Sequence, residues 1–216
     1  MVKVCGLTRQ EDVDFCRSAA VDWLGFNFIS WSKRLINPVE AERLWVASKP
    51  AMSDSRAVGI VADHSLAEIS HIVAQFPSLA GLQLHGGESI EFVQQLRVLH
   101  PEMYLIKAVG ASAEEAIVCA APWAGVADLV LFDTSAGGVR FGGSGKTFPW
   151  QWLGGLRDIS PCVAFGVAGG LTVENLSEAL RWGPALVDLN SGVESSPGIK
   201  SGPLLIEALE VLARRP

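Results

Sequence analysis

The feature that most constrains the fold is a regular alternation of short apolar runs with segments of helical periodicity. The runs are rich in Val, Ile and Leu and lack the strict apolar–polar alternation of a half-exposed strand, which is typical of strands buried on both faces of a parallel sheet. Eight such runs occur, at Val2–Cys5, Trp23–Ile29, Ala57–Ala62, Gly81–His85, Tyr104–Val109, Asp128–Asp133, Cys162–Val167 and Ala185–Asn190.

The spacing of the runs favours a closed barrel. Dividing 216 residues among eight units gives 27 residues each, enough for a strand of about 5 residues, a helix of about 11 and two short loops. We therefore expect an α/β chain forming one compact (β/α)8 TIM barrel over residues 1–216. The alternative is an open doubly wound sheet, but its dinucleotide-binding fingerprint is absent after the first run, at Cys5–Thr8.

Capping residues predict where several helices begin. Three segments have the pattern of a capping box, with Ser or Thr followed three residues later by Glu: Thr8–Glu11, Ser65–Glu68 and Ser112–Glu115. Asn37 before Pro38 predicts an N-cap with proline at the first helical position. A last helix is expected over Pro203–Arg214, with an apolar face toward the barrel.

Composition excludes several classes of partner. Apolar residues make up 49% of the chain and charged residues 19%, with a net charge of −6 and no cluster of Lys and Arg. Neither nucleic acid nor a membrane surface is therefore an expected partner. The start of the chain lacks the pattern of a signal peptide and no apolar run is long enough to span a bilayer, so we expect a cytoplasmic protein with free thiols.

If the chain is a barrel, the reactive residues should follow the carboxyl ends of the strands. This criterion selects Cys5, His85, Lys107 and Asp133, together with the small-residue loops after the seventh and eighth runs. All of these positions converge on one mouth of the barrel.

The two small-residue loops predict a phosphate site. The segments Ala168–Thr172 and Asn190–Glu194 each lead from a strand toward a helix, and exposed amides at such turns bind anions without a basic side chain. In barrels the loops after strands seven and eight frequently bind phosphate. We expect contacts from Gly169, Gly170, Ser191 and Gly192, although ordinary turns that need glycine for a positive φ are the alternative.

The segment Arg140–Thr147 looks like a nucleotide-binding P-loop but lacks its first glycine, because Arg140 occupies that position. Long loops in compact domains usually serve function. We expect the stretch Thr134–Pro149 to be a lid over the site instead.

Six blocks, in order along nearly the whole chain, resemble the phosphoribosylanthranilate isomerase family of tryptophan biosynthesis. Any one of these glycine-containing blocks would be weak evidence, but six in the right order at barrel spacing are specific. The blocks are Lys3–Thr8, Gly25-Phe26 with Ser32–Arg34, Gln83–Gly86, Gly142–Phe148, Ala168–Thr172 and Ser191–Glu194.

The resemblance implies an Amadori rearrangement of N-(5-phosphoribosyl)anthranilate to 1-(2-carboxyphenylamino)-1-deoxyribulose 5-phosphate, without cofactor or metal. It assigns Cys5 as general base and Asp133 as general acid, and it implies that Arg34 holds the anthranilate carboxylate. The chemistry fits these residue types, since an acid must open the sugar ring and a base must then remove the C2 proton. His85 is expected to line the pocket.

Three positions depart from the family pattern: Trp31, Pro149 and Asn190. These departures leave open a non-catalytic barrel that binds phosphate. Lys107 on a strand leaves open a second alternative, a Schiff-base lyase or aldolase acting on sugar phosphates. In each case the partner is a small phosphorylated molecule, and we expect a monomer or a homodimer.

Overall fold

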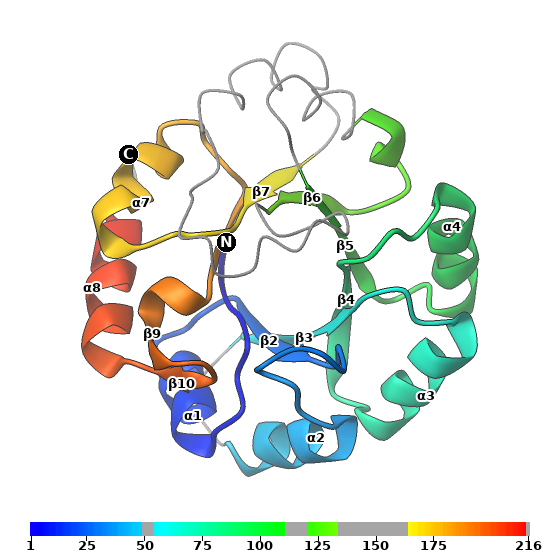
Figure 1. The fold of residues 1–216 in the computed structure, drawn as a ribbon, viewed down its shortest axis with the longest axis horizontal. Coiled ribbons are helices and arrows are strands. Elements are labelled where there is room, and N and C mark those ends of the chain that lie inside the picture. Colours follow the sequence, from blue (N-terminus) through cyan, green and yellow to red (C-terminus); the bar gives the residue numbers. More distant parts are fainter. Residues whose placement is uncertain (49–53, 111–120, 134–163, 215–216) are drawn as a thin grey trace.

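The computed structural model describes residues 1–48, 54–110, 121–133 and 164–214. Eight parallel strands close into a barrel in the order of the sequence (Figure 1), as the (β/α)8 prediction requires. The strands are β1 Val2–Val4, β2 Trp23–Asn27, β3 Arg56–Val61, β4 Leu79–Leu84, β5 Tyr104–Val109, β6 Leu129–Phe132, β7 Phe165–Val167 and β8 Leu186–Leu189.

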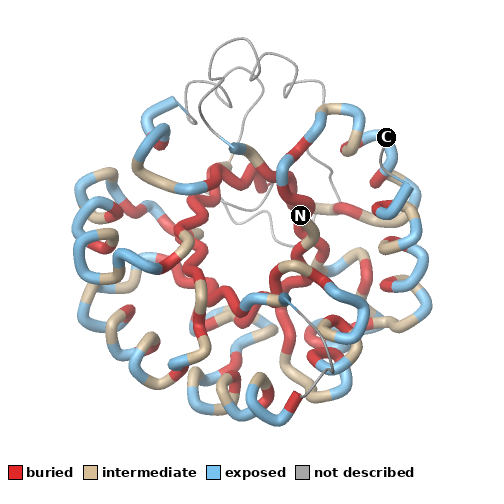
Figure 2. Tube along the Cα trace, turned by 180° about the vertical axis from the view of Figure 1, so that it is seen from behind, coloured by how far each residue is buried: buried red, intermediate tan, exposed pale blue. Residues whose placement is uncertain are grey.

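Helices surround the barrel, and Figure 2 shows the buried strands as a central ring with the exposed helix faces outside. Within the described residues no helix is long and apolar enough to cross a membrane. The α-helices are α1 Gln10–Ser18, α2 Pro38–Ala47, α3 Leu66–Gln75, α4 Ile90–Leu99, α7 Val173–Leu180 and α8 Gly202–Ala213, and a short 3-10 helix, η1, spans Ala121–Trp123.

Two of the predicted helix starts are confirmed. The Ser65 hydroxyl accepts a hydrogen bond from the Glu68 amide, and the Glu68 carboxylate accepts one from the Ser65 amide, which forms the capping box of α3. The Asn37 side chain accepts from the Glu40 amide at 2.8 Å, and Pro38 is the first residue of α2. The box predicted at 112–115 lies outside the described residues.

The capping box predicted at Thr8–Glu11 is wrong. Helix α1 begins at Gln10, with Arg9 as its N-cap. The Thr8 hydroxyl instead donates to the Gly198 carbonyl at 2.7 Å, 190 residues away. The Thr8 hydroxyl therefore makes a long-range hydrogen bond and does not cap the helix.

Three candidate site residues lie one position beyond the ends of their strands. The predicted runs extended to Cys5, His85 and Asp133, whereas β1, β4 and β6 end one residue earlier. Backbone hydrogen bonds still reach these residues: the Cys5 amide donates to Leu189 at 2.8 Å, that of His85 to Val61 at 2.8 Å, and that of Asp133 to Val109 at 3.1 Å. Each residue therefore keeps the orientation of its strand while standing at the rim.

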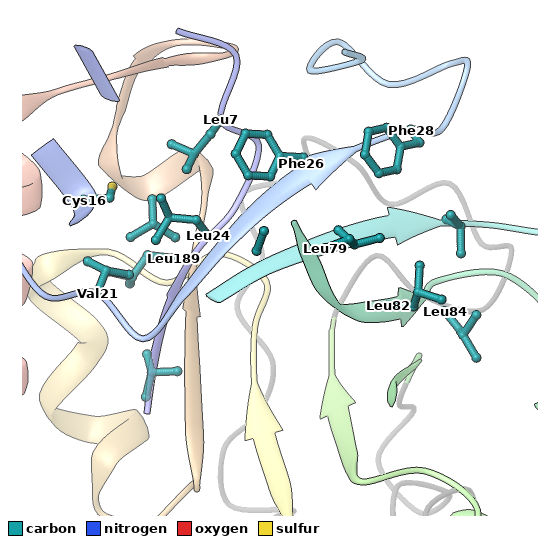
Figure 3. Close-up of a cluster of buried hydrophobic side chains, with 14 of the residues drawn as sticks. Leu7, Cys16, Val21, Leu24, Phe26, Phe28, Leu79, Leu82, Leu84 and Leu189 are labelled. Atoms are coloured by element: carbon teal, nitrogen blue, oxygen red, sulfur yellow. The ribbon is translucent and has the colours of Figure 1, made fainter. Parts of the chain in front are cut away.

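Alternation along the strands divides the buried side chains into two cores. Leu24 and Phe26 of β2, and Phe28 beyond it, point to the same side (Figure 3) and pack with helix residues in the outer core; Phe26 stacks edge-on against Phe76. Trp23 belongs to a smaller cluster that contains only strand residues and those bordering them, which is the barrel interior. Because adjacent residues point to opposite faces, the parity of a position decides which core it enters.

A short antiparallel hairpin, β9 Glu194–Ser196 with β10 Ile199–Lys200, follows β8. This hairpin is absent from the elements expected from the sequence. Its turn contains Pro197 and Gly198, and Gly198 has φ +82°, so the Pro-Gly pair was the available signal.

Candidate active site

The mouth of the barrel brings Cys5, His85 and Asp133 to the interior face of the wall. Cys5 lies two residues beyond Lys3, and Asp133 lies two beyond Leu131, a residue of the interior cluster. Cys5 is 5% exposed and Asp133 8% exposed, whereas His85 is partly exposed. The alternation that buries the interior core thus also aims these three side chains inward.

A buried polar layer lies directly below these residues. The Lys3 ammonium donates to Gln83 Oε1 at 2.7 Å and to Asp188 Oδ2 at 2.6 Å, and all three side chains are buried. The strand-end criterion selects none of these three residues. A signal was present, because Lys3, Gln83 and Asp188 each stand two residues before a strand-end residue of a functional block: Cys5, His85 and Asn190.

The charge of Lys3 acts on Cys5. Burial raises the pKa of the Cys5 thiol above its ordinary value, and the nearby Lys3 ammonium partly opposes this shift. Burial also disfavours the charged form of Lys3, but Asp188 and Cys5 together more than compensate, so the pKa of Lys3 is raised. Cys5 is therefore a protonated thiol at neutral pH, with a permanent positive charge beside it that favours the thiolate.

Asp133 and Asp188 are close enough to interact electrostatically. Asp188 uses Oδ2 for Lys3, while its buried Oδ1 has no hydrogen-bond partner within the described part of the chain. A buried acceptor without a partner is costly. The floor of the mouth therefore contains a buried Asp188 oxygen without a partner among the described residues, and the negative charge of Asp133 contributes to raising the pKa of Asp188.

Arg34 reaches the mouth from the segment after β2 and forms a two-pronged ion pair. Its Nε and one terminal nitrogen donate to the Glu194 carboxylate at 2.8 and 2.6 Å, and Lys200 binds the same carboxylate at 2.8 Å. Burial alone would raise the pKa of Glu194, but Arg34 and Lys200 together hold it below its ordinary value. The hairpin β9–β10 therefore supplies the groups that orient Arg34.

Gly6 lets Arg34 cross close to the first strand. It has φ +75°, and a Cβ at this position would lie 2.4 Å from Arg34 Cδ. Cys5 in its thiolate form would raise the pKa of Arg34, which places the guanidinium near the sulfur.

Two of the departures from the family pattern fall on described residues. Trp31 is 70% exposed. The Asn190 side chain accepts from Lys200 through Oδ1 at 3.1 Å, so it is tied to the group that holds Glu194. Pro149 and the proposed lid over 134–149 lie outside the described residues.

The two glycine loops lie against each other at the mouth. Gly169 and Gly170 have φ +80° and +64°, and within the described residues their amides have no acceptor. A Cβ at Gly192 would lie 1.8 Å from the Leu171 carbonyl oxygen, so only glycine fits there. Ser191 and Gly192 form a 3-10 turn after β8, and the predicted phosphate contacts are thus neighbours in space.

Lys107 does not point into the barrel. Ile106, its neighbour on β5, belongs to the interior cluster, while Leu105 and Val109 belong to the outer core. The Lys107 ammonium binds Glu88 Oε2 at 2.7 Å and lies 5.5 Å from the Trp123 ring centre. The geometry therefore removes the support for a Schiff-base lysine, because the amine lies on the outer face of the wall and is already paired.

Instead, Lys107 and Glu88 join the loops that follow β3 and β4. Glu88 Oε1 accepts from the amides of Asp63 and Gly86, both at 3.1 Å, and Lys107 donates to the Gly86 carbonyl at 2.7 Å. Asp63 has φ 55°, in the left-handed region, and a Cβ on Gly86 would lie 2.4 Å from Asp63 Oδ1. This outer brace supports the backbone next to His85.

Comparisons with known proteins agree along the whole chain. Residues 2–211 match the family model described as N-(5'-phosphoribosyl)anthranilate (PRA) isomerase. The chain is 38% identical over 216 residues to the N-(5'-phosphoribosyl)anthranilate isomerase of Cereibacter sphaeroides, covering 99% of this chain and 98% of the relative. It is 36% identical to that of Nostoc punctiforme, covering 99% of each.

Solved structures give the same result. The phosphoribosyl anthranilate isomerase of Thermotoga maritima superposes with a TM-score of 0.85 at 32% identity, covering 98% of both chains. Another isomerase structure, in complex with reduced 1-(o-carboxyphenylamino)-1-deoxyribulose 5-phosphate, has a TM-score of 0.82 at 30% identity, covering 98% of this chain and 97% of that one.

Proposed function

Because the chain belongs to the N-(5'-phosphoribosyl)anthranilate isomerase family, we propose that Cys5 and Asp133 are the base and the acid of its reaction. The chain is an aldose–ketose isomerase of tryptophan biosynthesis that rearranges N-(5-phosphoribosyl)anthranilate to 1-(2-carboxyphenylamino)-1-deoxyribulose 5-phosphate. The observation that carries the assignment is the position of both side chains at strand ends on the interior face of one barrel mouth.

The reaction needs an acid to open the sugar ring and a base to remove the C2 proton. Asp133 donates a proton to the furanose ring oxygen as the C1–O bond breaks, and the nitrogen lone pair forms a C1=N iminium. Cys5 then removes the C2 proton; the C–H electron pair forms a C1=C2 double bond and the iminium electrons return to nitrogen. The resulting enol becomes the C2 ketone when C1 gains a proton and the C2 hydroxyl loses one.

The raised pKa of Cys5 in the free protein is compatible with this role. An iminium next to the sulfur adds a second positive charge to that of Lys3, and nearby cations favour the thiolate. The positive intermediate therefore activates the base at the step that needs it.

The two ends of the substrate have separate binding groups. We assign the phosphate to the amides of Gly169 and Gly170 and the turn at Ser191 and Gly192, because such amides bind anions in a protein of net negative charge. We assign the anthranilate carboxylate to Arg34, whose guanidinium keeps donors beyond those used by Glu194. His85 lines the same mouth.

We propose that one barrel domain over residues 1–216 contains the whole site, and that the protein acts in the cytoplasm as a monomer or homodimer. One Thermotoga maritima relative is described as dimeric. We infer that the partner is a small phosphorylated substrate, because the net charge of −6 disfavours binding to nucleic acid and to anionic membranes.

The test is a fluorescence assay in which the substrate is generated in situ and its loss is followed with enzyme. Cys5→Ala and Asp133→Ala should each lower kcat by about 10²- to 10⁴-fold, with circular dichroism unchanged. Cys16→Ala is the matched control, because Cys16 is buried in the outer core and burial raises its pKa to about 12. Near-normal rates in both site variants would contradict the roles, and an inactive wild type would favour the non-catalytic barrel.

A further inference from the structure

We propose that Lys3 and Gln83 fix His85 in the neutral tautomer that carries its proton on Nε2, so that the ring presents an N–H donor to an oxygen of the substrate. Lys3 and Gln83 are then positioning residues for His85. The identity of the acceptor rests on the proposed function, whereas the tautomer is a property of the free protein.

The first step is the orientation of the Gln83 amide. An ammonium group only donates hydrogen bonds, so the Gln83 atom 2.7 Å from Lys3 Nζ must be the carbonyl oxygen Oε1. The reverse orientation would set two donors against each other beside a buried charge. The ion pair from Lys3 to Asp188 at 2.6 Å holds the ammonium in place.

The second step follows from the other end of the same amide. Gln83 Nε2 lies 3.1 Å from His85 Nδ1. An amide nitrogen only donates, so Nδ1 must accept through its lone pair and carries no proton. A neutral imidazole then has its proton on Nε2.

Burial of Lys3 and Gln83 strengthens this arrangement of hydrogen bonds. Lys3 is fully buried and Gln83 is 2% exposed, so water does not compete for the hydrogen bonds of the ammonium and the amide. His85, in contrast, is partly exposed at the rim. A permanent charge inside the barrel thus determines which atom of a rim residue bears a hydrogen.

The tautomer gives His85 and Cys5 different roles at the mouth. Within the described residues His85 Nε2 has no hydrogen-bond partner, so its N–H is available to a substrate oxygen with a lone pair, in a hydroxyl or a carboxylate. A ring in this state donates to substrate and does not abstract its proton. This agrees with Cys5 as the base.

The direct test is ¹⁵N NMR of the substrate-free protein labelled in its histidines. The chain has four, and loss of one signal set in His85→Gln assigns His85. At pH 7.5 we expect the two-bond coupling pattern of the Nε2–H tautomer. A ring protonated on Nδ1, or on both nitrogens, would overturn the proposal whether or not the protein is an active isomerase.

Two variants test the cause. In Gln83→Glu the carboxylate accepts at both ends, so the ring should change to Nδ1–H and kcat/KM should fall at least about tenfold. Gln83→Met removes the amide without imposing a tautomer, and should give a mixture and a smaller loss. Retention of the pure Nε2–H pattern in Gln83→Glu would contradict the role of Gln83.

Discussion

Lys3 and Lys107 are two buried strand lysines with similar local chemistry and different positions. Each is ion-paired with a buried carboxylate, Lys3 with Asp188 at 2.6 Å and Lys107 with Glu88 at 2.7 Å. Each donates to further oxygens. Lys3 lies inside the barrel below Cys5, whereas Lys107 lies on the outer face of β5.

The difference teaches that nearness to a strand end does not make a residue part of the site. The parity of the position decides whether it faces the mouth or the helices, because successive side chains point to opposite faces. Lys107 is two residues before Val109, which is in the outer core. Lys3 shares its face with Cys5, so its charge can lower the pKa of the proposed base.

Replacing the interior lysine should have the largest effect. Lys3→Met leaves Asp188 charged and buried without its partner, which we expect to cost about 3–5 kcal/mol of unfolding free energy. It should also lower kcat/KM by about 10²-fold, because Cys5 loses the charge that favours its thiolate. Chemical denaturation and the fluorescence assay measure the two effects.

The pH profile separates the electrostatic role from mere destabilisation. Lys3 lowers the pKa of Cys5, so removing Lys3 raises that pKa and moves the alkaline rise of kcat/KM to higher pH. Lys3→Arg keeps the charge and should leave this rise near its wild-type position. An unmoved profile in Lys3→Met would contradict the account of the interior lysine.

Replacing the outer lysine should reduce stability without a matching loss of chemistry. Lys107→Met leaves the buried Glu88 carboxylate without its cation, for a similar cost of about 3–5 kcal/mol, while kcat should stay within about tenfold of wild type because the amine does not reach the mouth. Borohydride with a ketose phosphate should leave Lys107 unmodified by mass spectrometry. A trapped adduct on Lys107 would make the lysine an active-site group.

A smaller effect is expected where the hairpin orients Arg34. Glu194→Gln weakens the two-pronged pair and should raise KM about three- to tenfold with kcat little changed, since Arg34 is assigned to binding. Steady-state kinetics measure this split. A fall in kcat at constant KM would place Arg34 in the chemical step.

The smallest effect is expected for loss of a helix cap, which serves as a control for the other variants. Ser65→Ala removes the N-cap of α3 and should cost about 1 kcal/mol, with unchanged kcat and KM because the cap belongs to neither lysine cluster. Denaturation curves and the assay test both parts. A change in kcat or KM in Ser65→Ala would mean that destabilisation alone alters activity. The kinetic effects of the Lys3 and Lys107 variants would then have to be corrected for their lower stability.

Local rules predicted the fold well where one physical effect dominates. The buried runs gave all eight strands because parallel strands need apolar residues on both faces, and Ser65 and Asn37 cap helices as expected. Thr8 shows where local rules fail. Its hydroxyl donates a hydrogen bond to the Gly198 carbonyl, far away in the sequence, and a local capping pattern cannot indicate such a distant partner.

In the candidate site, too, local rules predict some features and miss those that depend on long-range contacts. Strand ends selected Cys5, His85 and Asp133, but the same criterion also selected Lys107, because it ignored the parity that separates the two faces. The sequence pattern places Glu194 only at the end of a phosphate loop, whereas its pair with Arg34 depends on a hairpin that forms after β8. Such pairings over 160 residues are not encoded locally.

The most direct test of the account is a crystal structure of this protein with reduced 1-(o-carboxyphenylamino)-1-deoxyribulose 5-phosphate bound. We predict the phosphate on the amides of Gly169, Gly170 and the turn at Gly192, and the sugar chain in contact with both the Cys5 sulfur and the Asp133 carboxyl. A phosphate bound elsewhere, or a sugar that touches only one of these two side chains, would contradict the account.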